Sequence, residues 1–137
     1  MDRNGRIKAL VDHRENPRYK GVLPDADVAV PGGSPECGGS VVIYLKGGGE
    51  GEIEALSFTG EGDTISMGAT SMALDLVMRE RLTMDQVLAL DYDEFIDRVG
   101  RDVVGSRTRN ATLGLSTLKA AIRKYREEEA RRSGRVS

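Results

Sequence analysis

The sequence predicts a single α+β domain in which a three-stranded, mainly antiparallel sheet carries helices on one face. Strand-like segments occur in the first half of the chain, at residues 28–30, 40–46 and 52–59. Segments with a helical spacing of apolar residues follow, and they continue almost to the C-terminus. Strands followed by a run of helices are typical of α+β proteins, because the helices then segregate to one face of an antiparallel sheet.

The composition argues against two functional classes, nucleic-acid-binding proteins and membrane proteins. The 137 residues suffice for one domain, which we place at 1–130, followed by a polar tail at 131–137. The chain has 20 Lys and Arg against 22 Asp and Glu, and 4% aromatic residues. We therefore expect neither the basic face nor the aromatic platform of a nucleic-acid-binding protein. No apolar run approaches the ~18 residues of a membrane helix, and no signal peptide is recognisable, so we expect a cytoplasmic protein without membrane partners.

The N-terminal half begins with a helix predicted over residues 6–13. It ends before Pro17, because a residue that precedes proline disfavours the helical conformation. The stretch 31–39, rich in glycine and proline, is expected to be a turn that leads into the second strand. The glycines at 47–51 are expected to form a hairpin turn, because a phosphate-binding loop would be followed by a helix rather than a strand.

The C-terminal half is predicted to contain two long helices. The first begins at Thr64, where the pattern of apolar residues changes to helical spacing. Asp63 directly precedes this helix and is expected to be its N-cap, with its carboxylate accepting helix amide protons. The last helix is expected over residues 111–130, with apolar residues at a spacing of three and four.

Two short helices are predicted between the long ones. Thr83 with Gln86 and Asp91 with Glu94 have the spacing of a capping box, in which each residue accepts a hydrogen bond from the backbone of the other. Gly100 then fits the end of the second short helix, because glycine is the usual residue just past a helix C-terminus.

Cys37 is the candidate nucleophile. It is the single cysteine, which excludes an internal disulfide and a metal cage built from cysteines of one chain. Glu36 precedes it and two glycines follow, and the small glycines are expected to leave the sulfur accessible to another protein's active site. Such access is what a thiol-transfer step needs. An inert surface cysteine is the alternative.

Other polar residues have a structural and a functional interpretation. Asp63 could be a metal ligand as well as an N-cap. His13, at the end of a predicted helix, is expected to be a cap or a partly buried polar residue. Arg107 and Arg109 fit either a solvated basic turn or a contact with an anion or an acidic partner.

Four segments of the chain stand out when they are taken in order: DHRENPR at 12–18, PECG at 35–38, GEGDTISM at 60–67 and SRTRNATLGL at 106–115. Together they resemble the iron–sulfur cluster assembly scaffolds of the IscU/SufU/NifU type. The resemblance runs from about Ile7 to Tyr125 without a large gap. It implies the fold of that family, which the SufE-type sulfur acceptors share.

The chemistry of the family that this chain resembles depends on three cysteines and on an aspartate two residues after the first. The thiolates hold a nascent [2Fe–2S] cluster, or zinc in some members, and one accepts sulfur from a cysteine desulfurase. Here the first cysteine is Cys37, whereas Gly39 stands at the aspartate position. Asp63 and Asn110 stand at the second and third cysteine positions, and Arg109 stands where some branches have a histidine.

The resemblance therefore implies a cysteine-depleted scaffold. A stable [2Fe–2S] cluster is not expected, because thiolates are the main ligands of such clusters. Cys37, Asp63 and Asn110 remain as candidate ligands for Fe or Zn. The implied function is that of a sulfur carrier or scaffold rather than an enzyme: Cys37 would receive persulfide from a cysteine desulfurase and pass the sulfur to downstream iron–sulfur or sulfur acceptor proteins.

Two alternatives stay open at this point. The chain could be a non-catalytic paralogue that docks on the desulfurase or a client and regulates it. It could also be a mononuclear Fe or Zn protein that uses Cys37 and Asp63, with His13 or a residue from a partner. The sequence leaves a homo-oligomer open as well. In each case we expect the segments of Cys37, Asp63 and Asn110 to converge at one end of the molecule.

Overall fold

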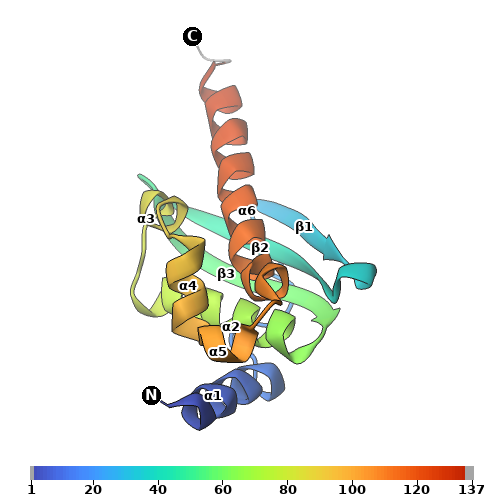
Figure 1. Ribbon diagram of the computed structural model, residues 1–137. Coiled ribbons are helices and arrows are strands. Elements are labelled where there is room, and N and C mark those ends of the chain that lie inside the picture. The colour runs from blue at the N-terminus through green and yellow to red at the C-terminus, as the bar shows by residue number, and fades with distance from the viewer. Residues whose placement is uncertain (1, 135–137) are drawn as a thin grey trace.

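The computed structural model describes residues 2–134. Figure 1 shows a sheet crossed by one long helix, with the other helices beside it. In chain order the elements are α1 (Arg3–Glu15), β1 (Val28–Ser34), the 3-10 turn η1 (Pro35–Cys37), β2 (Gly39–Gly49), β3 (Glu52–Gly62), α2 (Thr64–Arg79), α3 (Met84–Leu88), α4 (Tyr92–Val99), α5 (Arg101–Val104) and α6 (Thr108–Gly134).

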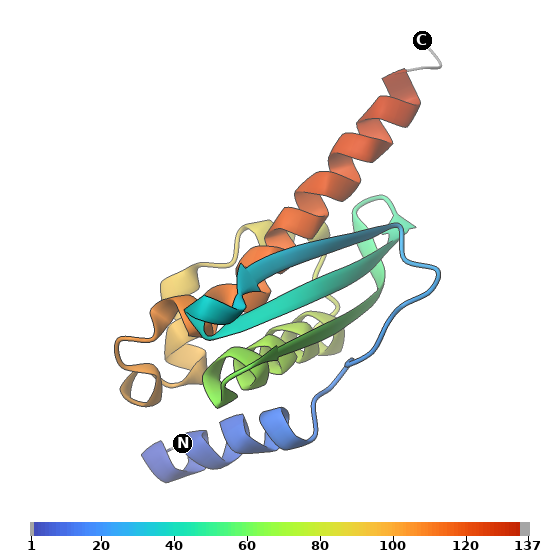
Figure 2. The ribbon, with the colours of Figure 1, turned by 90° about the vertical axis from the view of Figure 1, so that its right-hand side faces the viewer.

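The sheet confirms the predicted fold class. Its order is β1-β2-β3, and both pairs of neighbouring strands are antiparallel. Alternate residues of β2 are buried, and Ile43 in its middle pairs with Val30 of β1 and Phe58 of β3. Helices α2 and α6 pack against the sheet and against each other, and both views place them on the same face (Figures 1 and 2). The apolar core lies between these helices and the sheet.

The first strand is longer than the sequence predicts. Residues 31–34, expected to be part of a turn, continue β1 and pair with residues 39–42 of β2. The turn is thereby reduced to η1 and Gly38. Gly32 lies against α6, where a Cβ atom would overlap the side chain of Thr117. The glycines here permit a close approach of strand and helix, in addition to forming a turn.

The short helices agree with the prediction in part. Thr83 and Gln86 form the expected capping box. Asp91 caps α4 by accepting a hydrogen bond from the amide of Asp93, without the reciprocal bond that the Asp91–Glu94 spacing predicts. Helix α5, a single turn between α4 and α6, is too short to give a periodic signal in the sequence.

Helix α6 is longer at both ends than predicted. It begins at Thr108, so Asn110 lies in its first turn, and it runs to Gly134. The first part of the expected polar tail is thus helical, and residues 135–137 lie outside the described part of the chain. Although α6 is long enough to cross a membrane, neither it nor another helix of residues 2–134 is apolar enough to do so.

Candidate functional site

The candidate site lies where three segments distant in sequence meet. Cys37 ends η1 between β1 and β2, Asp63 directly precedes α2, and Asn110 lies in the first turn of α6. The side-chain amide of Asn110 connects them: Nδ2 donates a hydrogen bond to Asp63 Oδ2 at 2.8 Å and a longer one to the carbonyl oxygen of Cys37 at 3.4 Å. The structure therefore brings together the three residues that the sequence singled out.

Gly38 makes this convergence sterically possible. Its φ of +94° lies in the left-handed region, which glycine adopts without the penalty that a Cβ atom imposes. A Cβ at this position would collide with Asn110 Nδ2 and lie 3.1 Å from Asp63 Oδ2. The carbonyl of Gly38 accepts a hydrogen bond from the backbone amide of Asp63 at 2.9 Å. The turn after Cys37 thus packs directly on the Asp63–Asn110 pair.

Asp63 is the N-cap that the sequence predicts, and it also pairs with α6. Its Oδ1 accepts the backbone amide of Ser66 at 2.7 Å. Its Oδ2, besides accepting from Asn110, lies 3.7 Å from the guanidinium of Arg107. The sequence left two interpretations of Arg107 open, a solvated basic turn or a contact with an anion or an acidic partner. In the structure its guanidinium faces a carboxylate of its own chain.

The thiol of Cys37 is exposed at the edge of a hollow of about 280 Å³. The wall of this hollow is formed by the end of β1, by Cys37 and Gly39, and by residues of α6 that include Arg109, Asn110 and Leu113. It is open to solvent and combines an apolar surface with the positive charge of Arg109. A small anionic group or the extended segment of a partner could reach Cys37 there.

The side chains at the site do not fit a bound metal ion. Among residues 2–134, no three His, Cys, Asp or Glu side chains are grouped closely enough to hold one. Asn110 turns its amide nitrogen, rather than a ligating oxygen, toward Asp63. Gly39 offers no side chain, and a zinc or iron–sulfur centre needs more donors than one thiol and one carboxylate.

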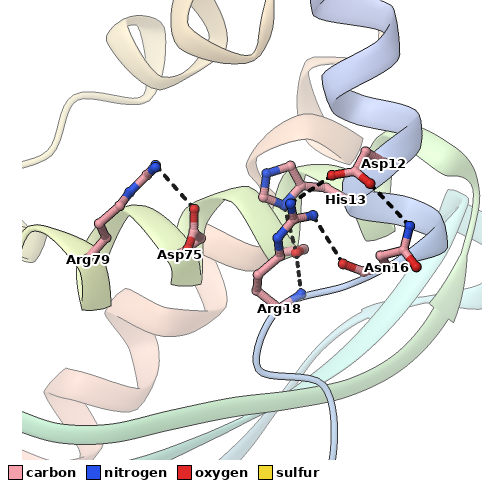
Figure 3. Close-up of polar contacts among 7 residues, drawn as sticks. Asp12, His13, Asn16, Arg18, Asp75 and Arg79 are labelled. Carbon is pink, nitrogen blue, oxygen red and sulfur yellow. Dashed lines mark hydrogen bonds and ion pairs between the residues drawn. The ribbon is translucent and has the colours of Figure 1, made fainter.

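His13 belongs to a separate polar cluster between α1 and α2 (Figure 3). Its Nδ1 lies 2.8 Å from Oγ of Ser71, a fully buried residue that also accepts the backbone amide of Arg18 at 2.8 Å. Arg18 in turn pairs with Asp12 at 2.7 Å, and Asn16 donates to the same carboxylate at 3.1 Å. The DHRENPR segment thus fastens α1 and the following chain to the middle of α2.

The environment of His13 disfavours its protonation. Burial lowers the pKa of the imidazole most, and the positive charge of Arg18 lowers it further. Asp75, which pairs with Arg79 at 3.1 Å, and Asp12 raise the pKa by smaller amounts, and Arg79 lowers it least. Because Ser71 accepts from Arg18, its hydroxyl proton is available for Nδ1 of a neutral His13. Ser71 is not among the residues that the sequence singles out, although a serine among the apolar residues of a predicted helix is a signal that could have found it.

Known proteins and a family model resemble this chain in sequence. Residues 6–132 match the family model described as the NifU-like N-terminal domain. The chain is 29% identical over 132 residues to the zinc-dependent sulfurtransferase SufU of Bacillus subtilis (strain 168), covering 85% of this chain and 88% of that protein. It is 29% identical over 123 residues to the iron–sulfur cluster assembly scaffold protein IscU of Aquifex aeolicus (strain VF5), covering 89% and 76%.

The solved structures show the same fold. The N-terminal region of a nitrogen-fixing NifU-like protein from Brucella abortus superposes with a TM-score of 0.68, covering 88% of this chain and 93% of that one. Because the two sequences are 20% identical, this likeness extends to the fold alone.

Proposed function

We propose that this chain, which belongs to the family of NifU-like N-terminal domains, serves iron–sulfur cluster assembly as a sulfur acceptor. Cys37 would receive sulfur from a cysteine desulfurase and pass it to an iron–sulfur or sulfur acceptor protein. The observation that carries the proposal is the exposed thiol of Cys37 at a hollow framed by β1, η1 and α6. The names of its relatives, a sulfurtransferase and a scaffold protein, support the same process.

The proposed step is an exchange between a thiol and a persulfide. The thiolate of Cys37 attacks the terminal sulfur of a persulfide on the desulfurase cysteine and forms a new S–S bond. The old S–S bond breaks, and the desulfurase cysteine leaves as a thiolate with the electron pair of that bond. The terminal sulfur and its proton or charge move to Cys37, so the step needs neither an oxidant nor a reductant.

The surroundings of Cys37 suit this exchange. An attacking thiolate must reach the persulfide of another protein, and the exposed position of Cys37 permits that approach. The product persulfide carries negative charge when ionised, and the guanidinium of Arg109 in the same wall supplies a positive charge. The turn that holds Cys37 is fixed from behind by Asn110, so the thiol is presented at a defined place.

Intact mass under non-reducing conditions tests the proposal. The protein is incubated with a cysteine desulfurase and cysteine, and we expect a gain of one or more sulfur atoms that is absent in Cys37→Ser. Binding of the Cys37→Ser variant to the desulfurase, measured separately, serves as the control for folding and docking. An unchanged mass beside an active desulfurase would contradict sulfur transfer, and retained binding would then favour the docking paralogue.

A further inference from the structure

We infer that Asp63, Asn110 and Arg107 form a metal-independent clasp, in which an amide and a guanidinium occupy the carboxylate that would otherwise be available to a cation. The clasp ties the Cys37 turn to α2 and α6 without a metal ion. This inference deepens the proposed function and rests on it for the role of Cys37. Its metal and stability tests are independent of sulfur transfer.

Both oxygens of the Asp63 carboxylate already have hydrogen-bond partners. Oδ1 is taken by the backbone amide of Ser66 at 2.7 Å, and Oδ2 by Asn110 at 2.8 Å, with Arg107 at 3.7 Å. An ionised carboxylate only accepts hydrogen bonds, so the NH₂ group of Asn110, not its oxygen, must face Asp63. A cation bound by Asp63 and Asn110 together would need this amide to turn around and its hydrogen bond to break.

The clasp connects three segments that are distant in the sequence. Asn110 Nδ2 reaches both the Asp63 carboxylate at the N-terminus of α2 and the carbonyl of Cys37 on η1. The amide therefore bridges two segments from a third, as a metal ion does in a structural site. Hydrogen bonds to a charged carboxylate are stronger than neutral ones, which suits them to this task.

Position 39, two residues after Cys37, supplies no further anionic donor. Gly39 is buried, and a Cβ there would lie 2.9 Å from Cβ of Ser66 and 3.0 Å from its Oγ. Ser66 is fully buried, and its hydroxyl finds no hydrogen-bond partner within residues 2–134. Ser66 thus fills the space that a side chain at position 39 would need, so a ligand at that position is excluded by packing.

The positive charges at the site also disfavour a bound cation. The candidate site offers at most two anionic donors, the Cys37 thiolate and the Asp63 carboxylate, and Arg107 already faces the latter. A second guanidinium, that of Arg109, lines the hollow beside Cys37. A divalent cation would have to enter against these positive charges with half of the four protein ligands usual for structural zinc.

Zinc added to the purified protein tests the clasp directly. For the wild type we expect no stoichiometric zinc or iron after buffer exchange, and the same melting temperature with ZnCl₂ as with EDTA. In Asn110→Asp a second carboxylate of nearly the same size replaces the donor amide. This variant should melt at a lower temperature than the wild type, and zinc should raise it again, because the cation then takes the place of the amide.

Asn110→Ala is the matched control. It removes the clasp without adding a carboxylate, so its lower melting temperature should not respond to zinc. A wild type that retains one zinc or iron per chain, and loses it in Asp63→Asn, would overturn the inference. So would a melting temperature that falls when EDTA is added, or an Asn110→Asp variant that melts like the wild type and ignores zinc.

Measuring the gain of sulfur together with the metal content distinguishes a failure of this inference from a failure of the proposed function. If the wild type gains no sulfur but stays metal-free and insensitive to EDTA, the sulfur-acceptor role fails and the clasp stands. If Cys37 gains sulfur only in the presence of zinc, the clasp fails and the sulfur-acceptor role stands. For both to hold, Asn110→Ala should accept sulfur more slowly than the wild type while it binds the desulfurase equally well.

Discussion

At the scale of single residues, one glycine decides whether Cys37, Asp63 and Asn110 can meet. Gly38 has a positive φ, and the face on which a Cβ would stand is occupied by Asn110. A left-handed backbone costs a non-glycine residue roughly 1–2 kcal/mol. A collision with the clasp adds to that cost, because the amide of Asn110 would have to leave its hydrogen bonds.

We therefore predict that Gly38→Ala destabilises the protein more than Gly49→Ala does. Gly49 is the matched control, because its φ of +88° is similar and a Cβ there would meet nothing within 4 Å. Gly49→Ala should thus lower the free energy of unfolding by the backbone strain alone, about 1–2 kcal/mol. Urea unfolding of the two variants measures the difference, and equal losses would show that the contact with Asn110 has no energetic weight.

At the scale of elements, the attachment of α1 to α2 depends on an uncharged imidazole. His13 is held between Ser71 and positively charged side chains, and its pKa is lowered chiefly by burial. Such a group stabilises the fold at pH values above its ordinary pKa of about 6.5, and the stabilisation is lost as the pH falls through the lowered pKa of the folded state. The pKa of Asp12 is also lowered, chiefly by Arg18, but the titration of this carboxyl changes the stability of the fold only at more acidic pH.

We predict that the wild type loses stability between pH 7 and pH 5 and that His13→Gln loses less over the same interval. Glutamine can accept the Ser71 hydroxyl proton through its side-chain oxygen but does not titrate there. The free energy of unfolding by urea at several pH values measures both slopes. Equal slopes in the two proteins would mean that His13 does not control the pH dependence.

The elements differ in how far the sequence predicts them. The start of α2 at Thr64 and the capping box at Thr83 follow from local signals, because caps and apolar spacing act within one or two turns. The extension of β1 to Ser34 does not, because the pairing of its last residues with β2 depends on a distant segment. The sequence predicts a later start for α6, because the residue directly before Thr108 is an arginine, which is not among the usual N-cap residues.

The residues that form the site could be predicted from the sequence, but the chemical role of their side chains could not. The resemblance to the scaffold family placed Cys37, Asp63 and Asn110 at one end of the molecule, and the contacts of Asn110 join them there. That Asn110 donates rather than ligates depends on which way its amide turns, which sequence alone cannot show. The contact of Arg107 with Asp63 likewise depends on the position of a turn before α6.

At the scale of the whole molecule, the packing of α6 on α2 sets the geometry of the site. Gly114 of α6 lies against Thr70 of α2, so closely that a Cβ there would stand 2.7 Å from the backbone Cα of Thr70. The clasp is formed one helical turn before Gly114, between the first turn of α6 and the start of α2. The separation of these two helices therefore controls the distance between Asn110 and Asp63.

We predict that Gly114→Ala destabilises the protein and slows the acceptance of sulfur by Cys37. The gain in helix propensity, about 1 kcal/mol, is outweighed by overpacking of typically 1–3 kcal/mol, because backbone rather than a mobile side chain is in the way. Gly68→Ala is the control: a Cβ there would meet Leu10 of α1 at 2.7 Å, on the side of α2 away from the clasp. Both variants should be less stable, but Gly68→Ala should accept sulfur at the wild-type rate in a time course of intact mass. Equally slow sulfur acceptance in the two variants would show that the α2–α6 contact does not control the site.

The structure and the proposed function together require that a single thiol, carried on a turn held by hydrogen bonds instead of a metal, accepts sulfur. The most direct test is the intact mass of the protein after reaction with a cysteine desulfurase and cysteine, run in parallel with EDTA and with added zinc. We predict the same gain of sulfur on Cys37 under both conditions, and none in Cys37→Ser. No gain in either arm, or a gain that requires zinc, would contradict the claim.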